Sequence, residues 1–242
     1  MKHFILKIVI ILILVLIVFQ LNNIQNSFNQ KNNSIGITKN QKYDLLSKVT
    51  TDIQIEYLKK YIGEAAILNF SEDKKQKEYI FVDPDYYIQA ITNPDDKILS
   101  YAITTRKSGF NPVLRIRSIE FQLGKTTFYN KDDKPMDCFA FAGNTAPSYY
   151  FEWYSGWNGT TYRDYMLGYN DAGYGNREII EATLLTEKDS ETPSEKPKFS
   201  CRMPSDEVRK KFTINTLIVS QAGFKSEFGY GVNRREMEFI NE

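Results

Sequence analysis

The chain has 242 residues, with 31 basic and 30 acidic side chains and a formal net charge of +1. This length allows one large domain or two small ones. The even charge balance lacks the clustered basic surface typical of nucleic-acid binding, so we expect no nucleic-acid partner.

The N-terminal segment is apolar from Phe4 to Leu21, interrupted only by one lysine and one glutamine. About 20 apolar residues suffice for a helix to cross the bilayer. Positive charge precedes this run, so the positive-inside rule places the rest of the chain outside the cytoplasm. Residues 1–21 are therefore predicted to be a signal-anchor transmembrane helix that contacts the lipid bilayer through residues 4–21. We expect a single-pass protein of the cell membrane.

The alternative for this segment is a cleaved signal peptide. Such a peptide would need small residues in an Ala-x-Ala-like arrangement just after the apolar run. The sequence there reads VFQLNNIQNSFNQ, without such a pair. Residues 22–40 are rich in Asn and Gln and are predicted to form a polar stalk, because they cannot bury enough surface to offset their ordering entropy.

A helix is predicted after the stalk. Apolar residues recur at three- and four-residue steps, the period of one helix face: Leu46, Val49, Ile53, Tyr57 and Tyr61. Asn40 suits the N-cap and Gly63 the C′ position. Residues 41–110 are therefore expected to hold one helix followed by an antiparallel meander.

The meander is predicted from four β-branched and aromatic runs, AILNF, KEYIFVD, YYIQAIT and ILSYAITTR. The stretches DPD and NPDDK separate them with turn-forming residues. Clustered oxygens at these stretches could bind Ca²⁺, but they lack the spacing of an EF-hand loop, so turns are favoured.

Residues 111–242 are predicted to form a second β-rich module packed on the first. VLRIRSIEFQL alternates like a strand, and RKKFTINTLIVSQAG supplies a late strand that Gly223 ends. The stretch from Ile62 to Asn69 also aligns with that from Leu123 to Asn130, which suggests two tandem copies. The predicted fold class is thus α+β: an N-terminal transmembrane helix, then an exported domain of one helix plus an antiparallel β meander.

The chain has two cysteines, Cys138 and Cys201, both in the region expected outside the cytoplasm. An even count in an oxidising compartment predicts a disulfide, and the alternative is two buried thiols. The bond would close a loop of about 60 residues and contribute on the order of 4 kcal/mol.

The segment from Tyr149 to Gly175 holds ten aromatic residues, including both tryptophans. Strand phasing points Tyr149, Phe151 and Trp153 to one face, apolar enough for a core, and Tyr150, Glu152 and Tyr154 to the other, whose composition is typical of a half-wet surface. Two interpretations stay open, a core of cross-strand pairs or a binding face. For the second we name five candidate binding residues: Tyr150, Trp153, Tyr154, Trp157 and Tyr162.

Catalytic signals are few. The only histidine, His3, precedes the apolar segment, so neither a Ser-His-Asp triad nor a His-based zinc site can form in the exported part. We expect no metal and no cofactor. Glu152, Asp164 and Asp171 could serve glycoside hydrolysis, which needs two carboxylates about 5–9.5 Å apart. The alternative is that they occupy turns and a wet sheet face.

Several stretches, among them YLKKYIG, LGKTTF and INTL, resemble an uncharacterised family of small membrane-anchored bacterial proteins. The helix–Gly–meander layout is also similar to the modules of β-lactamase-inhibitor-like proteins and outer-membrane assembly lipoproteins. That similarity implies protein binding through an aromatic-lined sheet. We therefore expect a non-catalytic binding domain, with an envelope protein or glycan as partner. The alternative is a carboxylate-dependent, glycan-active enzyme of the cell envelope.

Overall fold

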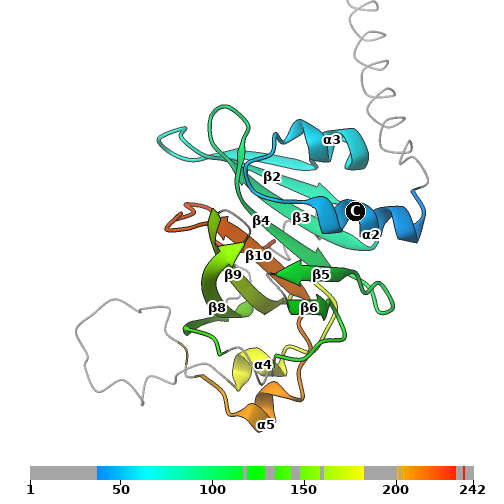
Figure 1. Cartoon of the computed structure of the whole chain (residues 1–242), viewed down its shortest axis with the longest axis vertical. Coiled ribbons are helices and arrows are strands. Elements are labelled where there is room, and N and C mark those ends of the chain that lie inside the picture. Colours follow the sequence, from blue (N-terminus) through cyan, green and yellow to red (C-terminus); the bar gives the residue numbers. More distant parts are fainter. Residues whose placement is uncertain are drawn as a thin grey trace, which may run out of the picture. The chain divides into compact units, whose positions relative to one another are not determined.

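The computed structural model describes residues 37–116, 119–128, 134–142, 148–158, 161–182, 201, 203–232 and 237 (Figure 1). The chain divides into two units, 1–42 and 43–242, and the first is described only over 37–42. The predicted anchor and all but the last four residues of the predicted stalk lie outside the described residues. None of the described helices is both long and apolar enough to cross a membrane.

One large antiparallel sheet dominates the second unit. Its eight strands lie in the order β1-β2-β3-β4-β10-β9-β8-β7, and β5 and β6 form a separate hairpin. The bounds are β1 Ile67–Phe70, β2 Lys77–Val82, β3 Tyr86–Thr92, β4 Ile98–Thr105, β5 Val113–Ile116, β6 Ile119–Gln122, β7 Asp137–Phe141, β8 Tyr149–Asn158, β9 Thr161–Asn170 and β10 Thr216–Gln221. The four described helices are α2 Lys39–Lys48, α3 Glu56–Ile62, α4 Glu178–Glu181 and α5 Asp206–Arg209.

The last strand joins the two halves of the sheet. β10 lies between β4 and β9 and pairs antiparallel with both (Figure 1). Two hydroxyl pairs mark the β4–β10 register, Ser100–Ser220 and Thr104–Thr216, each at 2.9 Å. Strands β1 to β4 therefore form one meander and β7 to β9 another, and a strand from the end of the chain connects them.

The prediction of one helix in 41–62 is wrong, because two helices occupy this region. Between them, Asp52 N–H donates to the carbonyl of Ile98, and Ile55 N–H donates to the carbonyl of Asp96. Because these N–H groups bond to the β3–β4 hairpin, they cannot make the i→i−4 hydrogen bonds that a continuous helix would need. The helix start also differs: Thr38 and Gln41 bond reciprocally in a capping box, two residues before the predicted cap at Asn40.

The four meander strands and their two turns are confirmed. In the first turn, Asp85 N–H donates to Asp83 Oδ1 at 2.9 Å. In the second, Lys97 N–H donates to Asn93 Oδ1 at 2.9 Å, and Asp96 has a φ of +62°. These side-chain-to-backbone bonds are the turn chemistry expected of Asp and Asn.

The sheet has two different faces. The first, here called the covered face, packs against the helices and the β5–β6 hairpin in the main core cluster, through residues that include Leu46, Leu58, Leu114, Phe121, Ile179 and Ile180. The second, here called the tail face, packs against the C-terminal residues Tyr230, Val232 and Met237 in two smaller clusters. Because both faces are covered there, every residue of β3 is buried.

The α+β prediction needs correction, because the described domain is sheet-dominated and its four helices are short. The tandem-copy alignment also fails. Gly63 follows helix α3, whereas Gly124 lies in the turn after β6. Both glycines have a positive φ, 96° and 76°. The two stretches therefore share glycine because the backbone requires it at both places, although the two places in the fold are not equivalent.

Candidate functional site on the aromatic hairpin

The aromatic segment forms two paired strands, β8 and β9. Ten residue pairs run from Tyr149↔Asn170 to Asn158↔Thr161. Tyr150, Glu152 and Tyr154 point to the covered face, and Tyr149, Phe151 and Trp153 point to the tail face. The predicted phasing is confirmed, but the face expected to be half wet is buried, and the face expected to be core is only partly covered.

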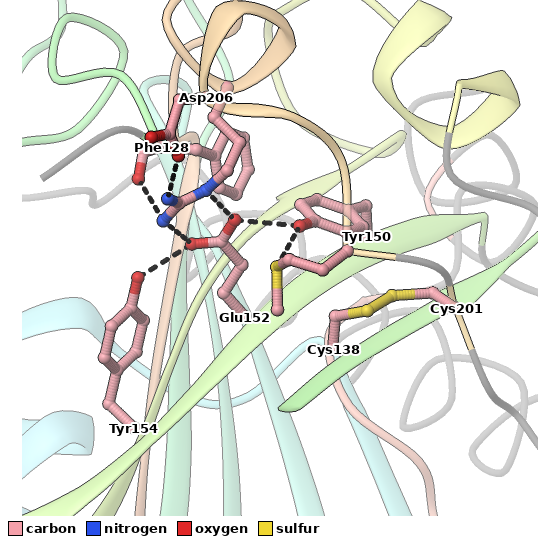
Figure 2. Close-up of polar contacts among 9 residues, drawn as sticks. Phe128, Cys138, Tyr150, Glu152, Tyr154, Cys201 and Asp206 are labelled. Atoms are coloured by element: carbon pink, nitrogen blue, oxygen red, sulfur yellow. Dashed lines mark hydrogen bonds and ion pairs between the residues drawn. A yellow bond between two sulfur atoms is a disulfide. The ribbon is translucent and has the colours of Figure 1, made fainter. Parts of the chain in front are cut away.

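Glu152 is fully buried and makes four hydrogen bonds (Figure 2). Its Oε1 accepts from Tyr150 Oη at 2.8 Å and from Arg209 Nε at 2.7 Å. Its Oε2 accepts from Tyr154 Oη at 2.7 Å and from Arg209 Nη2 at 2.7 Å. The carboxylate is thus held by a bidentate arginine and two phenols.

Arg209 comes from α5 and is also buried. Its Nη2 donates to the carbonyl of Phe128 at 2.9 Å, and its Nη1 donates to Asp206 Oδ1 at 3.3 Å. Desolvation lowers the pKa of Arg209, but its hydrogen bonds and ion pair with Glu152 outweigh this and raise it overall. Burial, with the nearby charge of Glu152, raises the pKa of Tyr150 well above its ordinary value. Arg209 is therefore protonated and the Tyr150 phenol is neutral at pH 7.

A disulfide lies beside this network (Figure 2). Cys138 of β7 is bonded to Cys201, with 5.7 Å between the Cα atoms and a sequence separation of 63, which confirms the predicted bond. Nearby, Tyr150 Oη also lies 3.6 Å from Met203 Sδ. The disulfide therefore ties the chain just before α5 to an outer strand of the sheet.

These contacts correct the expectation that the Tyr150–Glu152–Tyr154 face is half wet. An isolated buried carboxylate would be costly, but a bidentate arginine and two hydroxyl donors satisfy it. Since its oxygens are all bonded and no surface of the side chain is exposed, Glu152 is placed as a structural ion-pair partner. Tyr150 and Tyr154 are buried members of the same network and do not face a partner.

The tail face of the hairpin is more open. Phe151 is buried, whereas Tyr149 and Trp153 are half-buried. On the neighbouring strand β7, Phe139 pairs with Phe151 and Phe141 pairs with Tyr149. Phe139 and Phe141 are also half-buried. We call Phe139, Phe141, Tyr149 and Trp153 the aromatic patch.

The remaining predicted residues lie elsewhere. Tyr162 is 44 % exposed, and its register places it on the face of Trp153 and not on that of Tyr150. Trp157 pairs with Tyr162 in the backbone register, but its side chain lies outside the described part of the structure. Asp164 accepts from Ser155 Oγ at 2.9 Å and from Gly223 N–H at 3.1 Å. Asp171 accepts from Ser148 N–H at 3.2 Å, in the turn after β9.

No protein-family model, curated protein or solved structure shows significant similarity to this chain. The resemblances noted from short stretches and from layout therefore stay expectations. The function has to be argued from the residues of the domain itself.

Sequence reasoning missed Arg209, Phe139 and Phe141. Arg209 lies in the polar stretch SDEVRKK, which has no periodic signal. One indirect clue exists: a glutamate between two tyrosines of one strand face needs a cation if that face is buried. Which cation serves cannot be read from the sequence, because Arg209 lies 57 residues away.

Proposed function

We propose that this protein is held at the cell membrane by residues 4–21 and binds another envelope protein outside the cytoplasm, without catalysis. The aromatic patch is the proposed contact surface. A glycan is the alternative ligand, since aromatic rings also stack on sugars.

One observation carries the proposal: four aromatic side chains from two adjacent strands lie half-buried on one face at the end of the sheet. Tyr149 lies 5.0 Å from Phe151 and 6.0 Å from Phe141, measured between ring centroids. Trp153 and Tyr149 pack on the buried cluster of the tail face. Rings held this rigidly bury much area on binding at little entropic cost, which is why Tyr and Trp are frequent binding hot spots.

Two features support the location and the non-catalytic role. The Cys138–Cys201 disulfide is of a kind that persists in oxidising compartments outside the cytoplasm. Among the carboxylates of the aromatic hairpin, Glu152 is committed to Arg209, and Asp164 is bonded to Ser155 and Gly223. Binding is therefore the better supported use of this region.

The test is capture of the partner by the full chain carrying a photo-crosslinking residue at Trp153 in intact cells, followed by mass spectrometry. A Trp153→Ala variant should then reduce binding of the captured partner about tenfold or more, the size expected of a hot spot. Its melting temperature should change by only a few degrees, because the side chain is half-buried.

Tyr61→Ala is the matched control, since Tyr61 is 42 % exposed on α3 and belongs to no part of the patch. It should leave binding unchanged. Equal losses of binding for both variants, or a binding loss for Trp153→Ala that only follows its loss of folded protein, would contradict the proposal. Crosslinks to glycan alone would favour the alternative ligand.

A further inference from the structure

The residues after β10 lie against the sheet in an irregular, turn-containing conformation that is bonded to the sheet side through its main chain. We call residues Phe224–Val232 the tail. Gln76, just before β2, donates from Nε2 to the carbonyl of Lys225 at 3.1 Å, and its Oε1 accepts from Glu227 N–H at 3.2 Å. Gln89 Oε1 of β3 accepts from Gly231 N–H at 2.8 Å. Each of these amide side chains contacts the main chain of the tail, so these contacts do not depend on the tail's side chains.

Two tail side chains pack on separate apolar clusters. Tyr230 packs on the cluster of Ala102, Phe151, Met166 and Ile218, to which Trp153 and Tyr149 also belong at the margin. Val232, two residues later, is 1 % exposed and packs with Ile80 and Tyr87. Burial and the hydroxyl of Tyr230 raise the pKa of Tyr149, as expected for neighbouring phenols. The tail therefore reaches the aromatic patch.

Beneath the tail, hydrogen bonds fix the orientation of several polar side chains of the sheet. Gln89 Nε2 donates to Glu78 Oε1 at 2.5 Å, and Asn69 Nδ2 donates to Glu78 Oε2 at 2.7 Å. These bonds direct Gln89 Oε1 toward the N–H of Gly231. Beside it, the buried Nδ2 of Asn170 has no acceptor among the described residues. A buried amide donor without an acceptor is uncommon and calls for an explanation.

We propose that the tail face is a peptide-binding surface that the tail occupies in cis, and that a segment of a partner protein with an aromatic–Gly–aliphatic sequence displaces it by adopting the same backbone conformation. The inference rests on the proposed binding function and names the ligand chemistry. Such a ligand would repeat the main-chain bonds to Gln76 and Gln89 and could offer a carbonyl to Asn170 Nδ2.

Gly231 explains the glycine in the ligand sequence. Its φ is +86°, and a Cβ placed there would overlap Asn170 Nδ2. Gly229 has a similar φ of +78°, yet a Cβ there would meet nothing within 4 Å. The two positions carry the same backbone penalty, and only Gly231 adds a clash with the sheet.

The experiment measures binding of a fluorescent peptide with the tail sequence FKSEFGYGV to the intact chain by anisotropy. The tail competes at the millimolar effective concentration typical of a short tether, so wild type should bind the peptide weakly. Gly231→Ala should unseat the tail and strengthen peptide binding at least tenfold. Gly229→Ala adds only the shared backbone penalty and should strengthen binding less than Gly231→Ala, and a peptide with alanine in place of its second glycine should not bind.

Absence of peptide binding to Gly231→Ala, or equal binding to all three chains, would overturn the inference. A second readout covers the case in which Gly231→Ala fails to fold. In wild type, the Gly231 amide should exchange with solvent at least about 100-fold faster than the Ile218 amide, because a displaceable tail opens locally. Equal exchange rates would show that the tail is part of the cooperative core.

The two proposals fail separately. If crosslinks from Trp153 capture a protein but the peptide does not bind, the binding function stands and the cis-bound tail does not. If the peptide binds but Trp153→Ala leaves capture intact, the tail face is a peptide site and the aromatic patch is not the contact surface.

Discussion

The two faces of β8 differ in a way that their compositions do not suggest. The face with Tyr150, Glu152 and Tyr154 is polar, yet all three side chains are buried. The face with Tyr149 and Trp153 is apolar, yet it is only half covered by a tail. Polarity therefore does not decide which face becomes core. The face that meets complementary partners is buried, whatever charge it holds.

The groups that cover the two faces also differ in their chemistry. The covered face is closed by a bidentate ion pair, two phenol bonds and a neighbouring disulfide. On the tail face, the side chains of Gln76 and Gln89 bond to the main chain of the tail, and the tail side chains Tyr230 and Val232 pack on the sheet. We expect the first arrangement to control stability and the second to serve exchange of ligands.

The largest effect is expected from breaking the ion pair. Arg209→Met leaves Glu152 buried and unpaired, which should lower the free energy of unfolding by about 3–5 kcal/mol. Adding Glu152→Gln should recover at least half of that loss. Urea unfolding of the two single variants and the double variant would measure the coupling.

Arg163→Met is the matched control for that cycle. The Arg163 and Asp52 side chains are 11 % and 40 % exposed, and Asp52 also pairs with Lys97. Arg163→Met therefore leaves no buried carboxylate unpaired and should cost clearly less than Arg209→Met. A similar cost for Arg163→Met and Arg209→Met would remove the contrast between a buried and a surface pair.

A smaller effect is expected from the disulfide. Replacing Cys138 and Cys201 by serine should lower the free energy of unfolding by about 2–4 kcal/mol, because the unfolded chain regains the freedom of a long closed loop. The urea midpoint with and without a reductant measures this loss. If wild type under reductant matches the oxidised protein in stability, the bond contributes nothing to the covered face.

The smallest effect appears at high pH. Burial raises the pKa of Tyr101, on the covered face, above the ordinary value of about 10. Its stabilising contribution is complete below pH 10 and is lost as pH rises above 10, because the unfolded chain then releases the phenol proton first. At pH 11 the loss should be about 1.4 kcal/mol for this residue.

Tyr101→Phe should remove the contribution of Tyr101 to the decrease in the free energy of unfolding at high pH. Urea unfolding at pH 8 and pH 11 would measure it. Tyr149→Phe, on the tail face, should remove less, since Tyr149 is only half-buried. An identical pH dependence for wild type and Tyr101→Phe would show that Tyr101 is not buried in the native state.

Features set by near neighbours in the chain could be predicted. The strands from Ile67 to Thr105 follow from β-branched and aromatic runs, and their turns follow from Asp and Asn bonding to nearby backbone. The helix interruption at 49–55 could not be predicted, because the backbone of Asp52 and Ile55 bonds to residues more than 40 positions later. Apolar spacing there was helical, but long-range backbone pairing decided the structure.

The candidate site shows the same division. Phasing of Tyr149 to Tyr154 into two faces needed only the two-residue period of a strand. Composition alone was enough to propose Trp153 as a candidate contact residue. The burial of Tyr150 and Tyr154 was not predictable, because it depends on Arg209 arriving from α5.

By itself, the sequence determined the strands from Ile67 to Thr105 with their turns, the late strand β10, the two faces of the aromatic segment and the cysteines available for a disulfide. These follow from local periodicity, turn chemistry and composition, which act over a few residues. The sequence did not separate β5 from β6 and held no sign of β7. Only the tertiary structure decided which face is core and which residues the tail covers. The reason is physical: burial of a charged face depends on a counter-ion, and coverage of an apolar face depends on a segment, and both come from distant parts of the chain.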